Sequence, residues 1–288
     1  MKCVDRSGRE LVEDQGQQRI LRFLYEQRLG QSFLSLLIRP RVSKLAGRIL
    51  DSRLSGLAIA SFRKRHQISM EDFEERTYRS YNDFFTRRIK PGKRAFSDVP
   101  SELCAPCDSR LSVYPIHEDA HLTVKDTVYT MESLFHSRRI PKYYKGGTLC
   151  IFRLAVEDYH RYCYVDDGRK SKNYRIPGVF HTVNPLANDV YPIYKENTRE
   201  FSVLDSVHFG KILMMEVGAL MVGRIVNHHQ ERDVQRGEEK GFFEFGGSTV
   251  ILCFPAGCVQ IHDDILKNSA AGMETKVRQG ETIGFSIK

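Results

Sequence analysis

The hydrophobic pattern of this 288-residue chain changes near residue 100, and this change limits the fold more than any single motif does. Before it, apolar residues recur at helical spacing, as Val42, Leu45 and Ile49 do. After it, short apolar runs such as 148–154 and 249–254 are separated by turn-forming residues, which is typical of strands. The chain is therefore expected to combine an N-terminal helical part with a β-rich remainder.

These patterns predict an α+β fold with two parts. Residues 1–95 are expected to form basic amphipathic helices, and residues 96–288 a β-rich domain of short strands. Within the first part, Ser69–Asp72 has a capping-box pattern, and Pro91 with Gly92 is expected to end the helix that begins there. Hydrophobic residues make up 41% of the chain, which is enough for a folded core and excludes a disordered protein.

The net charge of +8 is concentrated in one segment. Residues 17–66 contain eleven basic and two acidic residues, a net charge of +9, whereas the rest of the chain carries −1. Such helices either pack on their own domain with a solvated basic face or lie on an anionic membrane surface. Nucleic acid is a poor partner for them, because their aromatic side chains fall on the apolar face and not between the arginines.

The sequence predicts no transmembrane helix and no signal peptide. The longest uncharged stretches of the basic segment, 29–38 and 54–62, fall well short of the roughly 20 residues that a spanning helix needs. Residues 1–13 are charged and have no apolar core. Seven cysteines without disulfide-type spacing favour a reducing, cytosolic compartment. Cys104 and Cys107 form half of a metal motif with no second half, so we expect a structural role and no metal.

One short motif carries chemistry. Gly246 and Gly247 precede Ser248 and Thr249, and an apolar run follows them. Taken alone, this segment is a tight turn that leads into a strand, because Gly-Gly-Ser is common in turns. The rest of the chain changes that interpretation.

Together with other segments, this motif resembles the self-cleavage site of phosphatidylserine decarboxylases. The similarity runs from about residue 70 to the C-terminus, and the motifs follow one another in the family's order. Each motif alone is weak, but their order makes the resemblance specific. The further motifs are Phe-Phe-x-Arg at 84–87, Asp-Tyr-His-Arg at 158–161, Val-Asn at 183–184, Asn-x-Arg at 197–199 and Val-Gly-Ala at 217–219.

The resemblance implies a chain that cleaves itself. The Ser248 hydroxyl would attack the carbonyl carbon of Gly247, and elimination would then separate a β chain, residues 1–247, from an α chain, residues 248–288. The α chain would begin with a pyruvoyl group derived from Ser248, which is the expected cofactor and acts as an electron sink. The implied reaction converts phosphatidylserine to phosphatidylethanolamine and releases CO2.

The resemblance also suggests acid–base residues and shows one departure. Asp108 matches the aspartate of the family's Asp-His-Ser cleavage triad, although Ser109 follows it where a glycine is usual. Many members carry a second histidine three residues after the one in Asp-Tyr-His-Arg, and this chain has a cysteine there. The base for self-cleavage is therefore left open among five residues: His160, His181, His228, His229 and Cys163.

Substrate binding and location follow from the same resemblance. Asp158 and Arg161 are expected near the substrate, because a guanidinium pairs well with a carboxylate or phosphate. An anionic membrane containing phosphatidylserine is the expected partner, which implies a peripheral protein on the cytoplasmic face that binds through residues 17–66. The β and α chains would stay together, and a homo-oligomer is left open. Two alternatives remain: a pyruvoyl decarboxylase of a small soluble amino acid, and a non-catalytic membrane-surface binding module.

Overall fold

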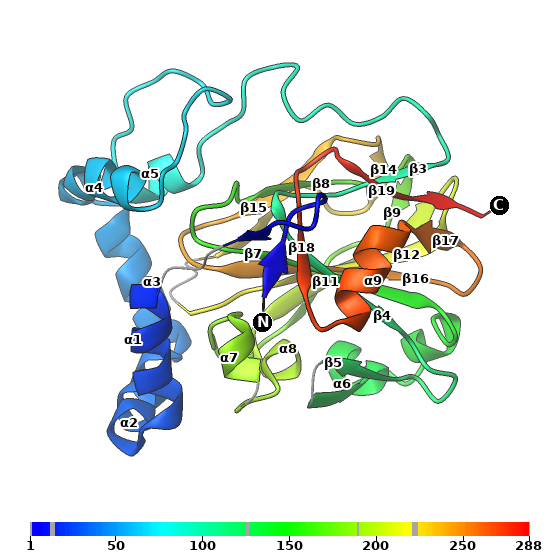
Figure 1. Cartoon of the computed structure of the whole chain (residues 1–288), viewed down its shortest axis with the longest axis horizontal. Helices are drawn as coiled ribbons and strands as arrows, with labels where there is room; N and C mark the ends of the chain where they lie inside the picture. The colour runs from blue at the N-terminus through cyan, green and yellow to red at the C-terminus, as the bar shows by residue number, and fades with distance from the viewer. Residues whose placement is uncertain (1, 12–14, 125–126, 189, 221–223, 288) are drawn as a thin grey trace.

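A computed structural model of the chain describes residues 2–11, 15–124, 127–188, 190–220 and 224–287. The N-terminal helices form a column beside a body made mostly of strands (Figure 1). The predicted fold class, basic helices followed by a β-rich domain, is confirmed.

The helical column, which we call the N-terminal arm, comprises residues 15–66. One face of the arm is buried through Leu21, Tyr25 and Leu34. Its backbone also joins the body, because the Phe180 N–H donates to the Ile38 carbonyl oxygen at 3.0 Å. The elements of the arm are α1 (Gln15–Glu26), α2 (Arg28–Leu37), α3 (Pro40–Leu50), the 3-10 helix η1 (Arg53–Leu57) and α4 (Ala58–Arg65).

The arm also carries large apolar side chains that are exposed to solvent. Leu54 and Leu57 are 79% and 83% exposed. No helix in the described part of the chain is long and apolar enough to cross a membrane. The other exposed apolar residues of the arm are Ile20, Phe23, Leu29, Phe33, Leu36, Leu45 and Ile49.

The prediction that a helix begins at Ser69 is wrong. Helix α5 spans only Tyr81–Phe85, and the Ser80 hydroxyl caps it by accepting the Asp83 N–H at 3.1 Å. The Ser69 hydroxyl accepts the Glu71 N–H in a local turn, which is the competing use of a serine side chain that weakens helices. A serine does cap a helix in this region, but it is Ser80, eleven residues after the predicted Ser69.

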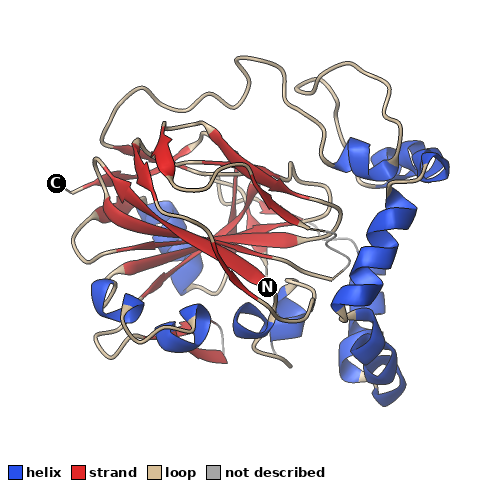
Figure 2. Cartoon of the chain, turned by 180° about the vertical axis from the view of Figure 1, so that it is seen from behind, coloured by secondary structure: helices blue, strands red, loops and turns tan. Residues whose placement is uncertain are grey.

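The body is built on one large mixed sheet (Figure 2). Its strand at residues 248–254 is buried along its whole length, as the apolar run 250–254 predicts. The strand order is β14 (Arg232–Val234), β9 (Gly168–Lys170), β11 (Arg199–Ser206), β12 (Gly210–Val217), β16 (Ser248–Phe254), β7 (Thr148–Leu154), β4 (Ser109–Pro115), β18 (Glu274–Val277), β1 (Cys3–Val4) and β2 (Glu10–Leu11), and β10 (Tyr174–Ile176) pairs with β11.

Smaller sheets and short helices surround this sheet. The three small sheets are β13 (Ile225–Asn227) with β15 (Glu239–Phe243) and β8 (Arg161–Cys163), then β17 (Val259–Ile261) with β19 (Thr282–Ser286) and β3 (Glu102–Cys104), and β5 (His121–Val124) with β6 (Thr127–Thr130). The remaining helices are α6 (Met131–Phe135), η2 (Ile140–Tyr143), α7 (Pro185–Asn188), α8 (Ile193–Glu196) and α9 (Asp263–Ala270).

Candidate active site

Ser248 is the first residue of the central strand β16. It pairs with Leu154 of β7, and its neighbour Thr249 pairs with Val217 of β12, so strands on both sides fix its backbone. The Ser248 side chain is fully buried, and its Oγ has no hydrogen-bond partner among the described residues. A buried hydroxyl usually has a partner, because leaving it without one costs free energy. The Ser248 hydroxyl is therefore not engaged in holding the fold together.

The loop before Ser248 is shaped by one glycine and clamped by aromatic rings. Gly246 has a φ of 124°, a conformation that favours glycine, whereas a side chain at Gly247 would meet only ordinary contacts. The Phe245 N–H donates to Asn82 Oδ1 at 3.0 Å. The Phe245 ring packs edge-on against Tyr81 and Phe85, at centroid distances of 5.0 and 5.3 Å. Helix α5 therefore holds the loop in place.

His160 is buried next to this loop. Its Nδ1 lies 2.9 Å from the backbone oxygen of Asp158, and its ring packs 4.1 Å from that of Phe85. Burial lowers the pKa of His160 to about 4, while the nearby backbone of Gly246 acts in the opposite direction. Nε2 is also buried and lacks a hydrogen-bond partner within the described chain.

Asp108 has no histidine partner within the part of the chain that the structure describes. Both of its carboxylate oxygens accept from Arg94, at 2.9 and 3.0 Å, and Oδ1 also accepts the Gln279 N–H at 2.8 Å. Arg94 has a φ of 57°, a strained backbone conformation for this residue. It also pairs with Asp72 at 2.8 Å. The expected Asp-His-Ser triad is therefore not assembled in this structure.

Cys163 is connected to Asp108 through a single residue, Gln279. The Gln279 Nε2 donates to the Cys163 Sγ at 3.2 Å, while the backbone of the same glutamine donates to Asp108. Burial raises the pKa of the Cys163 thiol, so this side chain is a poor base. Gln279 had not been singled out in the sequence, since it stands 171 residues from Asp108.

His181 is held by the N-terminal arm. Its Nδ1 lies 3.3 Å from the Tyr25 hydroxyl, its Nε2 lies 3.5 Å from Glu196, and its ring stacks on Tyr191. Burial lowers its pKa to about 4. The Tyr25 hydroxyl also accepts the Thr182 N–H at 2.9 Å. These contacts explain His181 as a residue that joins the arm to the body.

The other candidates lie in ion pairs. Asp158 pairs with Arg110 at 2.9 Å. Arg161 donates to the Thr86 carbonyl oxygen and to Glu239. His228 contacts Glu239 at 2.6 Å, and His229 lies 3.7 Å from Glu238. No cluster of three or more metal-ligating side chains occurs within the described ranges.

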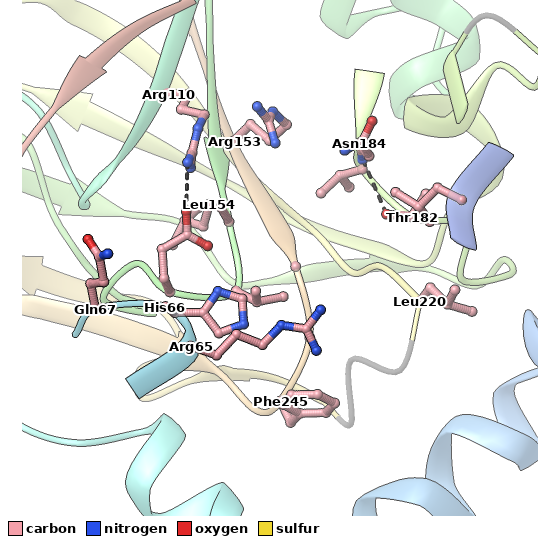
Figure 3. Close-up of a pocket in the computed structure, with 17 residues that line it drawn as sticks. Arg65, His66, Gln67, Arg110, Arg153, Leu154, Thr182, Asn184, Leu220 and Phe245 are labelled. Atoms are coloured by element: carbon pink, nitrogen blue, oxygen red, sulfur yellow. Dashed lines mark hydrogen bonds and ion pairs between the residues drawn. The ribbon is translucent and has the colours of Figure 1, made fainter. Parts of the chain in front are cut away.

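A cavity of about 600 Å³ opens beside the cleavage loop (Figure 3). Phe245, Gly246 and Gly247 form part of its wall, so the bond before Ser248 borders an open space. Neither Asp158 nor Arg161 is among the described residues that line it. Its other lining residues are Leu21, Arg65, His66, Gln67, Arg110, Arg153, Leu154, Ala155, Val156, Glu157, Thr182, Val183, Asn184 and Leu220.

Comparison with known proteins shows the family of the chain. A family model described as phosphatidylserine decarboxylase matches residues 81–285. The chain is 44% identical to phosphatidylserine decarboxylase proenzyme 2 of Clostridium acetobutylicum, over 92% of this chain and 91% of that protein. It is 38% identical to the phosphatidylserine decarboxylase proenzyme of Clostridium perfringens, over 95% of both chains. The site thus belongs to a decarboxylase, and the chain is a member of the phosphatidylserine decarboxylase family.

Proposed function

We propose that the protein is a precursor that cleaves itself between Gly247 and Ser248 and then decarboxylates phosphatidylserine. The observation that carries the first half is the orphaned, fully buried Ser248 Oγ at the start of a central strand, next to a glycine-shaped loop. The products are a β chain, residues 1–247, and an α chain, residues 248–288. The two relatives named above are proenzymes, which supports processing of a precursor.

The cleavage chemistry balances with the residues present and one water. Ser248 Oγ bonds to the Gly247 carbonyl carbon as the C–N bond breaks, which turns the peptide bond into an ester. Loss of the Ser248 α-proton then expels the Gly247 carboxylate. One water converts the remaining double bond into a keto group and releases ammonia. The attack occurs within one backbone segment, so proximity supplies much of the rate.

We propose that His160 takes the hydroxyl proton. Because a carbonyl oxygen only accepts hydrogen bonds, the contact with Asp158 assigns the ring hydrogen to Nδ1. The lowered pKa keeps the ring neutral at physiological pH, so Nε2 presents a lone pair. The His160 ring packs on Phe85, and the Phe85 ring packs in turn on Phe245 of the cleavage loop.

The site fits a pyruvoyl group derived from Ser248. Residue 248 follows a loop that borders the cavity, and nothing among the described side chains binds its hydroxyl. When formed, the group supplies an electron sink for the carbon that loses CO2. The protein's part is to hold residue 248 rigid between two strands and to close the site with Phe245 and α5.

The arm is proposed to rest on an anionic membrane at the cytoplasmic face. Its exposed apolar face carries Leu54 and Leu57, and segment 17–66 has a charge of +9. Apolar insertion and attraction to anionic lipids are the two contributions that bind amphipathic helices to bilayers. The buried face shows that the arm packs on its own body, and the proposal adds that its exposed apolar residues contact the membrane. The exposed face favours a lipid over a soluble amino acid as substrate.

Release of CO2 tests this function. Wild-type protein should release CO2 from anionic liposomes that contain phosphatidylserine and not from free serine. Ser248→Ala should abolish release. Ser202→Ala is the matched control, because Ser202 is another buried serine whose Oγ lacks a partner in the described structure, on β11. Equal release from free serine would support the soluble-substrate alternative, and no release from either would support a binding module.

A further inference from the structure

The N-terminal arm contributes directly to the cavity at the cleavage loop. Leu21 of α1 and three consecutive residues at the end of α4, Arg65, His66 and Gln67, line it together with Gly247. In Figure 3, Arg65 and His66 extend from one side of the cavity, and Arg110 and Arg153 from the opposite side. The arm is therefore part of the site and does more than attach the protein to a membrane.

The arginines on the body side are already neutralised. Arg153 forms a bidentate, buried ion pair with Glu274, and its Nε lies 2.7 Å from Oε1. Arg110 pairs with Glu157 at 2.7 Å and with Asp158 at 2.9 Å. Removing a buried charge from its partner is costly. These two guanidinium groups therefore keep the wall in shape and are poorly suited to bind an incoming anion.

Arg65 differs from these two arginines because its side chain is exposed to solvent, whereas theirs are buried. It is the last residue of α4, and its side chain is solvent-exposed while it lines the cavity. Arg63 and Lys64 share the same basic helical turn and are also exposed, but they are not among the described residues that line the cavity. Position alone thus separates Arg65 from two neighbours of equal charge.

We propose that Arg65 binds the phosphate of the phosphatidylserine head group, and so is a substrate-recognition residue that the arm supplies. This inference rests on the proposed function. A guanidinium presents two parallel N–H donors that match two phosphate oxygens. The phosphate is the group that Arg65 is expected to bind. A cation bound to the carboxylate would stabilise its negative charge and so oppose the loss of neutral CO2. The arm that docks on the lipid surface would then also position the head group.

A water-soluble phosphatidylserine with short acyl chains, used below its micelle concentration, separates recognition from membrane binding. Arg65→Gln should cleave itself like wild type but should raise KM for this substrate about tenfold or more, since hydrogen bonds between charged groups are strong. Arg63→Gln is the matched control and should leave KM unchanged. Arg65→Lys should have a KM between those of wild type and Arg65→Gln, because lysine keeps the positive charge but lacks the two parallel N–H donors of a guanidinium. Equal KM values for Arg65→Gln and Arg63→Gln would overturn the proposal.

Inhibition identifies the bound group. Short-chain phosphatidylglycerol carries the phosphate but no carboxylate, so it should compete with the substrate in wild type and Arg63→Gln and compete about tenfold more weakly in Arg65→Gln. Unchanged inhibition in Arg65→Gln, with a raised KM, would assign Arg65 to the carboxylate and contradict the proposal. Failure of the proposed function itself is distinct, because wild type would then release no CO2 at all.

Discussion

The Nδ1 atom of His160 lies 2.9 Å from the backbone oxygen of Asp158, so the neutral, buried ring carries its hydrogen on Nδ1 and a lone pair on Nε2. His160→Asn should therefore slow self-cleavage by about 100-fold or more, the usual contribution of a general base. The fraction of cleaved chain over time on a denaturing gel measures this. Cys163→Ser should cleave like wild type, because the Cys163 thiol has a raised pKa. The opposite pair of results would make Cys163 the base.

The stability of the uncleaved precursor should depend on His181. Burial holds its pKa at about 4, below the ordinary value of 6.5. The unfolded chain therefore binds more protons between these values, so the free energy of unfolding falls as pH drops from about 6.5 to about 4. The contribution lost at pH 4 is on the order of 3 kcal/mol.

Denaturant unfolding of Ser248→Ala, with and without His181→Phe, measures this dependence on one species. Phenylalanine keeps a ring that can stack on Tyr191. The double variant should lose less stability than the single one between pH 6.5 and pH 4. Parallel pH curves for the two proteins would show that His181 does not titrate in this window.

Asp108 should act through Arg94 and not through a histidine. Arg94→Gln leaves the buried Asp108 carboxylate without a cation, whereas Asp108→Asn leaves Arg94 paired with Asp72. Arg94→Gln should lower the free energy of unfolding by about 3 kcal/mol, Asp108→Asn should lower it less, and both should slow cleavage. Denaturant unfolding and gel analysis of cleavage test the two effects. If Asp108→Asn stops cleavage in a stable protein while Arg94→Gln cleaves normally, Asp108 has the triad role that the sequence suggested.

Membrane binding should depend on the apolar face of the arm. Leu54→Ser and Leu57→Ser should each weaken binding to anionic vesicles about tenfold, because each removes an apolar side chain that would be buried in lipid. Co-sedimentation with vesicles measures this. Val207→Ser is the control, since Val207 is 67% exposed but lies in the body. A loss of binding in the control and none in the arm would place the membrane surface elsewhere.

The parts of this account that the sequence predicted depend on short-range patterns. Helical spacing in the arm and apolar runs such as 249–254 fix the type of an element from neighbouring residues alone. The glycines before Ser248 predicted a tight turn that leads into a strand. Gly246 has a positive φ at this point, and a strand begins at Ser248. The misplaced helix at Ser69 shows the limit, because the same side-chain type also caps local turns.

The parts that it missed depend on packing between distant segments. Arg94 reaches Asp108 through a left-handed backbone conformation, and Gln279 contacts Asp108 from near the C-terminus. No pattern of neighbouring residues therefore predicts that Arg94 pairs with Asp108. Arg65 and His66 line the cavity only because α4 lies beside the body. Their neighbours in the sequence indicate only the basic C-terminal end of a helix.

Intact-mass analysis of the wild-type protein tests the central claim most directly. The account predicts two chains that divide between Gly247 and Ser248, with the smaller one, residues 248–288, beginning with a pyruvoyl group in place of serine. Ser248→Ala should give one full-length chain, and Ser202→Ala should give the same two chains as wild type. A single intact wild-type chain that nevertheless decarboxylates phosphatidylserine would contradict the account.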